Sequence, residues 1–84
     1  LRQGGAAPAV LNGGNEAVVE AFLDEELHFN HIASYLQSLM SLLDRWRQQP
    51  ECPNYLQHIN SVDDALAADR WGRSQLRHLL ETTS

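Results

Sequence analysis

The chain has 84 residues, of which 43% are hydrophobic and 20% are charged, so it holds at most one small domain with a core of its own. Eleven acidic against six basic residues give a net charge of -5, which argues against a surface that binds nucleic acid or an anionic membrane. All six basic residues are Arg, so mechanisms that need a lysine are excluded. The single Cys52 excludes an internal disulfide.

The first five residues have two interpretations. Leu1-Arg2-Gln3 before Gly4-Gly5 resembles the last turn of a helix followed by glycines that adopt the left-handed conformation. The alternative is a flexible tail. On the first interpretation the chain begins inside an element.

Residues 8–25 are predicted to form the first helix, because Pro8 is suited to a first helical turn. The expected buried face follows a spacing of three and four residues, with Glu16, Glu20 and Asp24 on another face. Gly13-Gly14 inside this segment weakens a helix, so either the helix begins after this pair or another backbone approaches closely there. The apolar residues of the expected face are Leu11, Val18, Val19, Phe22 and Leu23.

A second helix is predicted over residues 31–48, with Asn30 as its N-cap and Pro50 and Pro53 after its end. It carries an apolar stripe. A proline-bearing connection with a single helical turn over residues 55–58 is expected next. The stripe consists of Ile32, Leu36, Leu39, Met40, Leu43 and either Trp46 or Arg47.

The third helix is predicted over residues 62–82, with Ser61 as N-cap and Asp64 answering it in a variant of the capping box. Its inner face is apolar at both ends and polar or small in the middle, so a polar partner is expected for Asp69 or Arg73. With no alternating strand pattern or repeat, the class is all-α, a small bundle of three main helices. The expected inner face is Val62, Leu66, Asp69, Gly72 or Arg73, Leu76, Leu79 and Leu80.

Candidate chemical groups are few. Asp24, His28 and His31 have types and spacings that can hold zinc, but solvated surface residues explain them better. The run from Asp24 to Glu26 is unusual at a helix C-terminus, which suggests that the helix continues or that Arg residues approach. Asp63 and Asp64 are explained by capping.

The remaining candidates have plain structural interpretations. Cys52 lies between prolines with no histidine at a set spacing, so we interpret it as an ordinary loop thiol. Trp46 and Trp71 are interpreted as core or interface residues. We therefore predict no catalytic, cofactor-binding or metal-binding residue in this chain.

The segment Pro8-Ala9-Val10-Leu11-Asn12-Gly13-Gly14-Asn15-Glu16 resembles the C-terminal part of 1-deoxy-D-xylulose 5-phosphate reductoisomerase. The resemblance continues through Val19, Ala21-Phe22-Leu23, Leu27, Phe29 and Ile32-Ala33. It covers residues 8–33 well, and a weaker similarity returns over residues 59–63. Gly13-Gly14 stands where the family usually has Ala-Ala.

The resemblance implies that residues 1–84 are a noncatalytic helical domain of a much longer enzyme whose catalytic and dinucleotide-binding domains lie elsewhere. That enzyme converts 1-deoxy-D-xylulose 5-phosphate to 2-C-methyl-D-erythritol 4-phosphate in non-mevalonate isoprenoid biosynthesis. It uses NADPH and a divalent metal, Mg or Mn, and works in the bacterial cytoplasm or the plastid stroma. The resemblance carries no catalytic residue onto this chain.

The same resemblance places Leu1 to Gln3 at the end of a bundle's first helix, so a four-helix bundle lacking most of that helix is expected. The implied partners are the catalytic domain of the parent chain and a second copy of the fragment, with no nucleic acid or membrane. The alternative is a free-standing helical module that binds a partner helix. A small zinc enzyme using His28 and His31 is a third interpretation.

Overall fold

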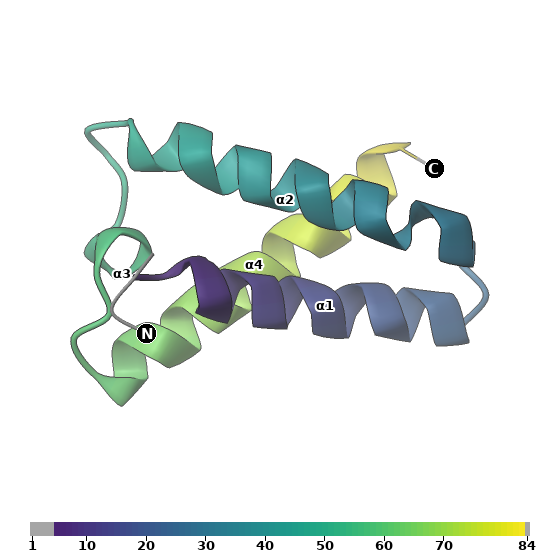
Figure 1. The fold of residues 1–84 in the computed structure, drawn as a ribbon, viewed down its shortest axis with the longest axis horizontal. Helices are drawn as coiled ribbons and strands as arrows, with labels where there is room; N and C mark the ends of the chain where they lie inside the picture. Colours follow the sequence, from purple (N-terminus) through teal and green to yellow (C-terminus); the bar gives the residue numbers. More distant parts are fainter. Residues whose placement is uncertain (1–4, 84) are drawn as a thin grey trace.

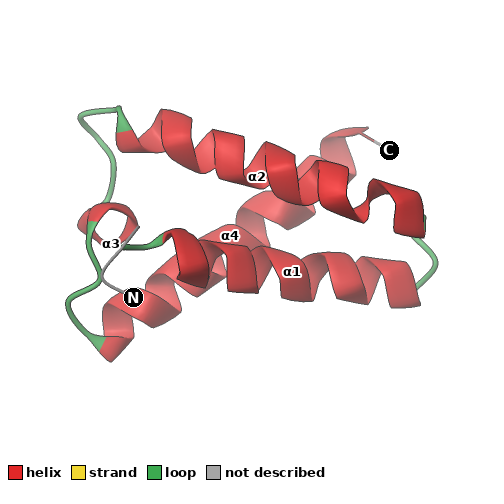
Figure 2. Cartoon of the chain, in the orientation of Figure 1, coloured by secondary structure: helices red, strands yellow, loops and turns green. Residues whose placement is uncertain are grey.

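This computed structural model describes residues 5–83, which contain three long helices and two short helical turns joined by loops. No strand occurs within these residues, which confirms the predicted class, a small all-α bundle with three main helices. The expected helical end at residues 1–3 lies outside the described residues. In chain order the elements are α1 (Ala7–Leu23), η1 (Phe29–His31), α2 (Ile32–Arg47), α3 (Asn54–Gln57) and α4 (Val62–Thr83) (Figure 2).

Helix α1 contacts both of the other long helices, and α4 more extensively than α2. Figure 1 shows α4 passing behind α1 and α2 running beside it, while the short α3 closes one end of the molecule. The molecule is elongated, with extents of 36 × 23 × 18 Å. In the described part of the chain, no helix is both long enough and apolar enough to cross a membrane.

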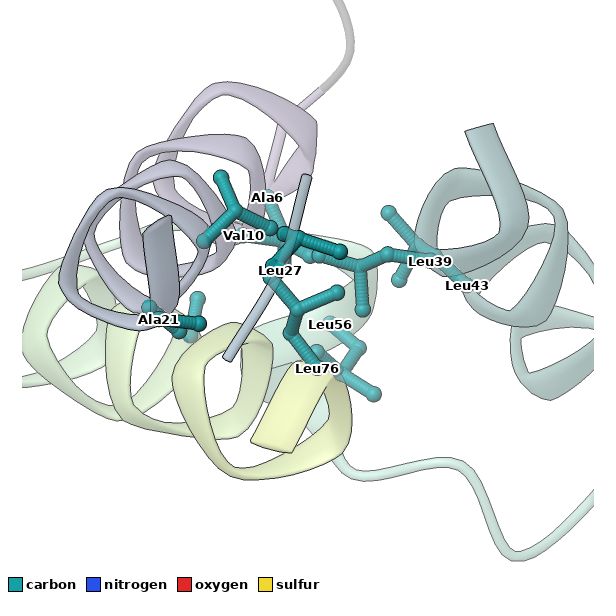
Figure 3. Close-up of a cluster of buried hydrophobic side chains, with 11 residues drawn as sticks. Ala6, Val10, Ala21, Leu27, Leu39, Leu43, Leu56 and Leu76 are labelled. Carbon is teal, nitrogen blue, oxygen red and sulfur yellow. The ribbon is translucent and has the colours of Figure 1, made fainter. Parts of the chain in front are cut away.

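Leucines at the centre and small residues around them form the core. Figure 3 shows leucine side chains from α2, α3, α4 and the loop after α1 converging on one point. At roughly 1.5–3 kcal/mol for each buried leucine, this cluster is the main source of stability. The buried core residues are Ala6, Val10, Ala17, Val18, Ala21, Leu27, Leu39, Leu43, Leu56, Ala68 and Leu76.

The expected buried face of α1 is wrong in most of its members. Only Val18 of the five predicted residues is buried, whereas Leu11, Val19, Phe22 and Leu23 are exposed. The buried face is instead a stripe of small residues, which lets the α4 backbone come close. Its members are Val10, Gly13, Gly14, Ala17, Val18 and Ala21.

Helix α1 ends at Leu23, two residues before the predicted end. Glu25 adopts a left-handed conformation with φ of 63°, and the amide of Glu26 donates to the carbonyl oxygen of Ala21 at 2.8 Å. The amide of Glu25 donates to Phe22 at 3.1 Å. These two bonds form a Schellman turn, which satisfies the last carbonyls of the helix. The acidic run therefore lies on a turn and does not continue the helix.

The predicted cap of the second long helix is also wrong. Asn30 lies inside the 3-10 turn η1, and α2 begins at Ile32 with His31 as its N-cap and no side-chain cap bond. The turn leads directly into α2, so a backbone bond from the amide of His31 to the carbonyl of His28, 2.9 Å long, organises this entry. The apolar stripe of α2 is as predicted, with Leu39 and Leu43 fully buried.

The entry into α4 is the best-predicted local feature. The amide of Asp64 donates to the hydroxyl of Ser61 at 3.1 Å, as the capping box requires. Asp64 accepts in return from the amide of Asn60 at 2.9 Å. The single turn expected over residues 55–58 is present as α3, shifted by one residue.

The first turns of α4 differ from the expected inner face. Val62 and Leu66 are exposed. The carbonyl oxygen of Asp69 lies against Gly13 of α1, so only the turns before Asp69 extend beyond the beginning of α1 (Figure 1). Leu76 of the predicted face is fully buried.

Candidate functional site

Helices α1 and α4 touch through their backbones. A Cβ atom on Gly13 would overlap the carbonyl oxygen of Asp69 and lie 3.0 Å from the amide nitrogen of Arg73. A Cβ on Gly72 would overlap the carbonyl oxygen of Val10 in the same way. Of the two explanations for Gly13-Gly14, the close approach of another backbone is therefore correct for Gly13, whereas Gly14 lies against the side chain of Leu39. The glycines lie inside α1, as glycines at such contacts do.

This close approach brings a row of polar side chains together along the edge of the contact. Arg73 of α4 donates a hydrogen bond to Glu20 of α1 and lies 3.7 Å from a carboxylate oxygen of Glu16. The amide group of Asn12 donates to the carboxylate of Asp69 at 2.6 Å. The polar partners expected for Asp69 and Arg73 are thus present. Their identity was not predicted, although the carboxylates of Glu16 and Glu20, one turn apart, were the available signal.

The electrostatics of this row favour charged Arg73. Its hydrogen bond to Glu20, together with the negative charge of that carboxylate, raises the pKa of Arg73 above its usual value. Arg73 therefore stays protonated throughout the neutral range, and both carboxylates face a permanent cation. The side chains of Arg73, Glu16 and Glu20 are largely open to solvent. Their ion pairs therefore align α1 with α4 but add little to the free energy of unfolding.

A hollow of about 460 Å³ lies where the turn after α1 meets the last turns of α4. The rings of His28 and His31 meet edge to face in its wall, with centroids 6.0 Å apart. Asp24 does not line the hollow, so the structure brings together two of the three residues considered for zinc. The lining residues are Glu26, Leu27, His28, His31, Tyr35, Arg77, Leu80 and Glu81.

The hollow is lined by polar side chains, but they do not form a set of metal ligands. Among residues 5–83, no set of three or more His, Cys, Asp or Glu side chains is placed to hold a metal ion. Arg77 lines the same hollow as Glu26, but the salt bridges of the described residues include none between an Arg and the acidic run. Arg77 and Tyr35 were not predicted to lie here, because nothing in the periodicity of α2 or α4 shows which residue meets a distant turn.

The other candidates occupy ordinary positions. Cys52 is half-buried, and its thiol donates to the neighbouring carbonyl of Pro53 at 3.5 Å. Trp46 and Trp71 are half-buried and pack against the core, which is the predicted core role. Asp64 serves as a capping residue.

Comparison with known proteins gives consistent matches. The family model described as the DXP reductoisomerase C-terminal domain matches residues 1–75. The chain is a member of this family. It spans less than a fifth of the curated relatives that it matches, because 92% of the chain aligns with 17% of the 1-deoxy-D-xylulose 5-phosphate reductoisomerase of Nocardia farcinica at 39% identity.

Two further relatives of the DXP reductoisomerase C-terminal domain family show the same proportion. The enzyme of Mycolicibacterium smegmatis is 37% identical over 99% of this chain and 19% of its own length. The enzyme of a Nostoc species is 43% identical over 89% of this chain and 16% of its own. Both carry the same name as the Nocardia enzyme, and no solved structure matches the chain. The resemblance stated from the sequence is confirmed.

Proposed function

We propose that this chain is a noncatalytic C-terminal structural domain of a 1-deoxy-D-xylulose 5-phosphate reductoisomerase. The observation that carries the proposal is the family match over residues 1–75, in relatives of which the chain spans less than a fifth. The remaining four-fifths of such an enzyme has room for the dinucleotide-binding and catalytic domains. The full-length enzyme converts 1-deoxy-D-xylulose 5-phosphate to 2-C-methyl-D-erythritol 4-phosphate with NADPH and Mg or Mn.

In this proposal the domain acts by packing against the catalytic domain of its own parent chain. Large apolar side chains remain exposed on α1 and at the start of α4, and such surfaces are typical of contact sites. The bacterial relatives support a cytoplasmic parent enzyme. We further propose that the chain on its own self-associates, because its exposed apolar side chains then have no other partner.

The test uses the Mycolicibacterium smegmatis enzyme, of which this chain matches 19%. Three proteins are compared: the intact enzyme, the enzyme without the matched segment, and a chimera in which this chain replaces that segment. We expect deletion to lower kcat/KM at least tenfold and the chimera to restore most of the lost activity. The reason is that the domain packs against the catalytic domain and stabilises it without contributing catalytic residues. Full activity without the segment would contradict the proposal.

The isolated chain provides the second arm of this test. It is expected to give no substrate-dependent oxidation of NADPH and no saturable binding of NADPH by calorimetry. Turnover by the isolated chain would show that it holds catalytic groups, and would overturn the noncatalytic role. Stoichiometric zinc that is required for folding would instead favour the interpretation as a small zinc enzyme.

A further inference from the structure

Helix α1 has a second apolar face, which no other helix of the described chain covers. We define the open face by five exposed side chains on α1 and η1. At 100° per residue, those on α1 fall within an arc of about 120° opposite the small buried stripe. An arc of this width is what a helix normally turns toward a core. The five side chains are Leu11, Val19, Phe22, Leu23 and Phe29.

The open face is accessible and carries no charge. Phe22 and Phe29 meet edge to face with ring centroids 6.1 Å apart, which joins the turn after α1 to the helix. Figure 1 shows α4 behind α1 and α2 beside it, so the near side of α1 is uncovered. The positions between the apolar side chains carry Asn12 and Asn15, so no charge interrupts the face along its length.

We infer that, in the 84-residue chain, the open face pairs antiparallel with the same face of a second copy. The inference rests on the proposed self-association and names its surface and geometry. Leucines stand at both ends of the face, so an antiparallel partner places Leu11 against Leu23 and Leu23 against Leu11. Two-fold pairing of this kind needs a self-complementary patch. The leucines supply one at both ends of about 18 Å of helix, and Val19 and Phe22 then lie opposite the uncharged Asn15 and Asn12 of the second copy.

Charge selects the antiparallel direction. The acidic run from Asp24 to Glu26 follows the open face at the C-terminal end of α1. None of the salt bridges of the described residues includes this run. Parallel pairing would bring two such runs together, which is unfavourable. Antiparallel pairing places each run beside the start of the partner's α1, which carries no acidic residue in its first turn and has a partial positive charge.

The neighbouring edge tolerates a partner of the same charge. Glu16 and Glu20 border the open face, but both already interact with Arg73 of their own copy. A second copy therefore meets an edge that is partly neutralised. The remaining repulsion between two chains of net charge -5 weakens with salt, so the dimer is expected to tighten as the salt concentration rises.

The available area indicates a weak dimer. Taking roughly 150–200 Å² for a fully exposed side chain of this size, the open face presents on the order of 450 Å² of apolar surface per copy. Two such faces approach the ~1,000 Å² at which specific interfaces begin. We therefore expect dissociation in the micromolar to millimolar range, and the experiment must reach about 1 mM protein.

The test is sedimentation equilibrium on the wild-type chain and two matched double variants. Val19→Arg/Leu23→Arg alters the open face, where these residues are 42% and 70% exposed. Val62→Arg/Leu66→Arg makes the same change at the start of α4, at 74% and 48% exposure. Both variants change the net charge equally. We expect wild type and the α4 variant to reach twice the mass of 9.5 kDa, and the α1 variant to stay at the single mass.

The outcomes separate the two proposals. A wild-type chain that remains monomeric at about 1 mM overturns both self-association and the open-face dimer. If the wild type dimerises and the α1 variant still dimerises, or the α4 variant does not, self-association stands and the open face is not the interface. If circular dichroism shows the α1 variant to be unfolded, Leu23→Ser/Phe29→Ser replaces it, with an expected loss of at least tenfold in affinity.

The relative direction of the two α1 helices in the dimer is tested by disulfide trapping in a Cys52→Ser background. Chains with Leu11→Cys and chains with Leu23→Cys are mixed and oxidised. The antiparallel dimer gives mainly the mixed disulfide between the two kinds of chain. Crosslinks that form mainly between identical chains would overturn the antiparallel arrangement.

Discussion

The two faces of α1 differ in side-chain size far more than in hydrophobicity. The buried face, which meets α4 and α2, is built from glycine, alanine and valine, whereas four of the five side chains of the open face are leucine or phenylalanine. If burial followed hydrophobicity alone, the larger residues would be inside. They are outside because α4 approaches α1 so closely that only small residues fit between the two backbones.

The contrast teaches how a chain of 84 residues can keep a core while exposing large apolar side chains. Close backbone contact gains dispersion energy from many atoms at short range, and the leucines of α2, α3 and α4 fill the centre. The large residues of α1 are then available for a second contact. One helix thus joins the fold through one face and presents a docking surface on the other.

The largest expected effect in α4 is at Gly72, which packs against the buried face of α1. A Cβ there would overlap the carbonyl oxygen of Val10 and lie 2.9 Å from its carbonyl carbon. Backbone atoms cannot rotate away, so the two helices must separate. We expect Gly72→Ala to lower the free energy of unfolding by about 1–3 kcal/mol, although alanine favours the helix itself by about 1 kcal/mol. Urea denaturation monitored by circular dichroism measures the change, and an unchanged or higher stability would contradict the close contact.

A smaller effect is expected on the open face. Val19→Arg/Leu23→Arg replaces side chains that face solvent in the single chain, so the free energy of unfolding should change by no more than about 0.5 kcal/mol. The measurement is the same urea titration at a concentration below dimerisation. A loss comparable to that of Gly72→Ala would mean that the open face belongs to the core of the single chain, and the distinction between the two faces would fail.

Local sequence signals predicted the helices well. Three predicted features are present in the structure: the capping pair of Ser61 and Asp64, the end of α2 before the prolines, and the apolar stripe of α2. Each of them depends on only a few neighbouring residues. The family resemblance predicted the domain for a similar reason, because it rests on a continuous motif. The short turn α3 was predicted to within one residue.

Features set by distant contacts were predicted poorly. Periodicity shows that α1 has apolar faces, but it does not show which of them meets α4, since that depends on how close two backbones come. Asn30 has the chemistry of an N-cap, yet the 3-10 turn before α2 makes this cap unnecessary. The early end of α1 depends on Glu25 in a left-handed conformation, which is uncommon for a residue other than glycine.

In the candidate site too, features that depend on neighbouring residues were predicted, and features that depend on distant contacts were not. A polar partner for Arg73 could be expected from the polar middle of α4, but its identity as Glu16 and Glu20 needed the crossing of α1 and α4. Asp24, His28 and His31 looked like one group along the chain. The turn after α1 separates Asp24 from the hollow that the two histidines line.

The most direct test of the close contact compares alanine at two adjacent glycines. Alanine at Gly13 meets the backbone of Asp69, whereas alanine at Gly14 meets the end of the flexible Leu39 side chain. The account predicts that Gly13→Ala is less stable than Gly14→Ala by at least about 1 kcal/mol in urea denaturation, with Gly14→Ala within about 1 kcal/mol of wild type. Equal stability of the two variants, or a more stable Gly13→Ala, would contradict it.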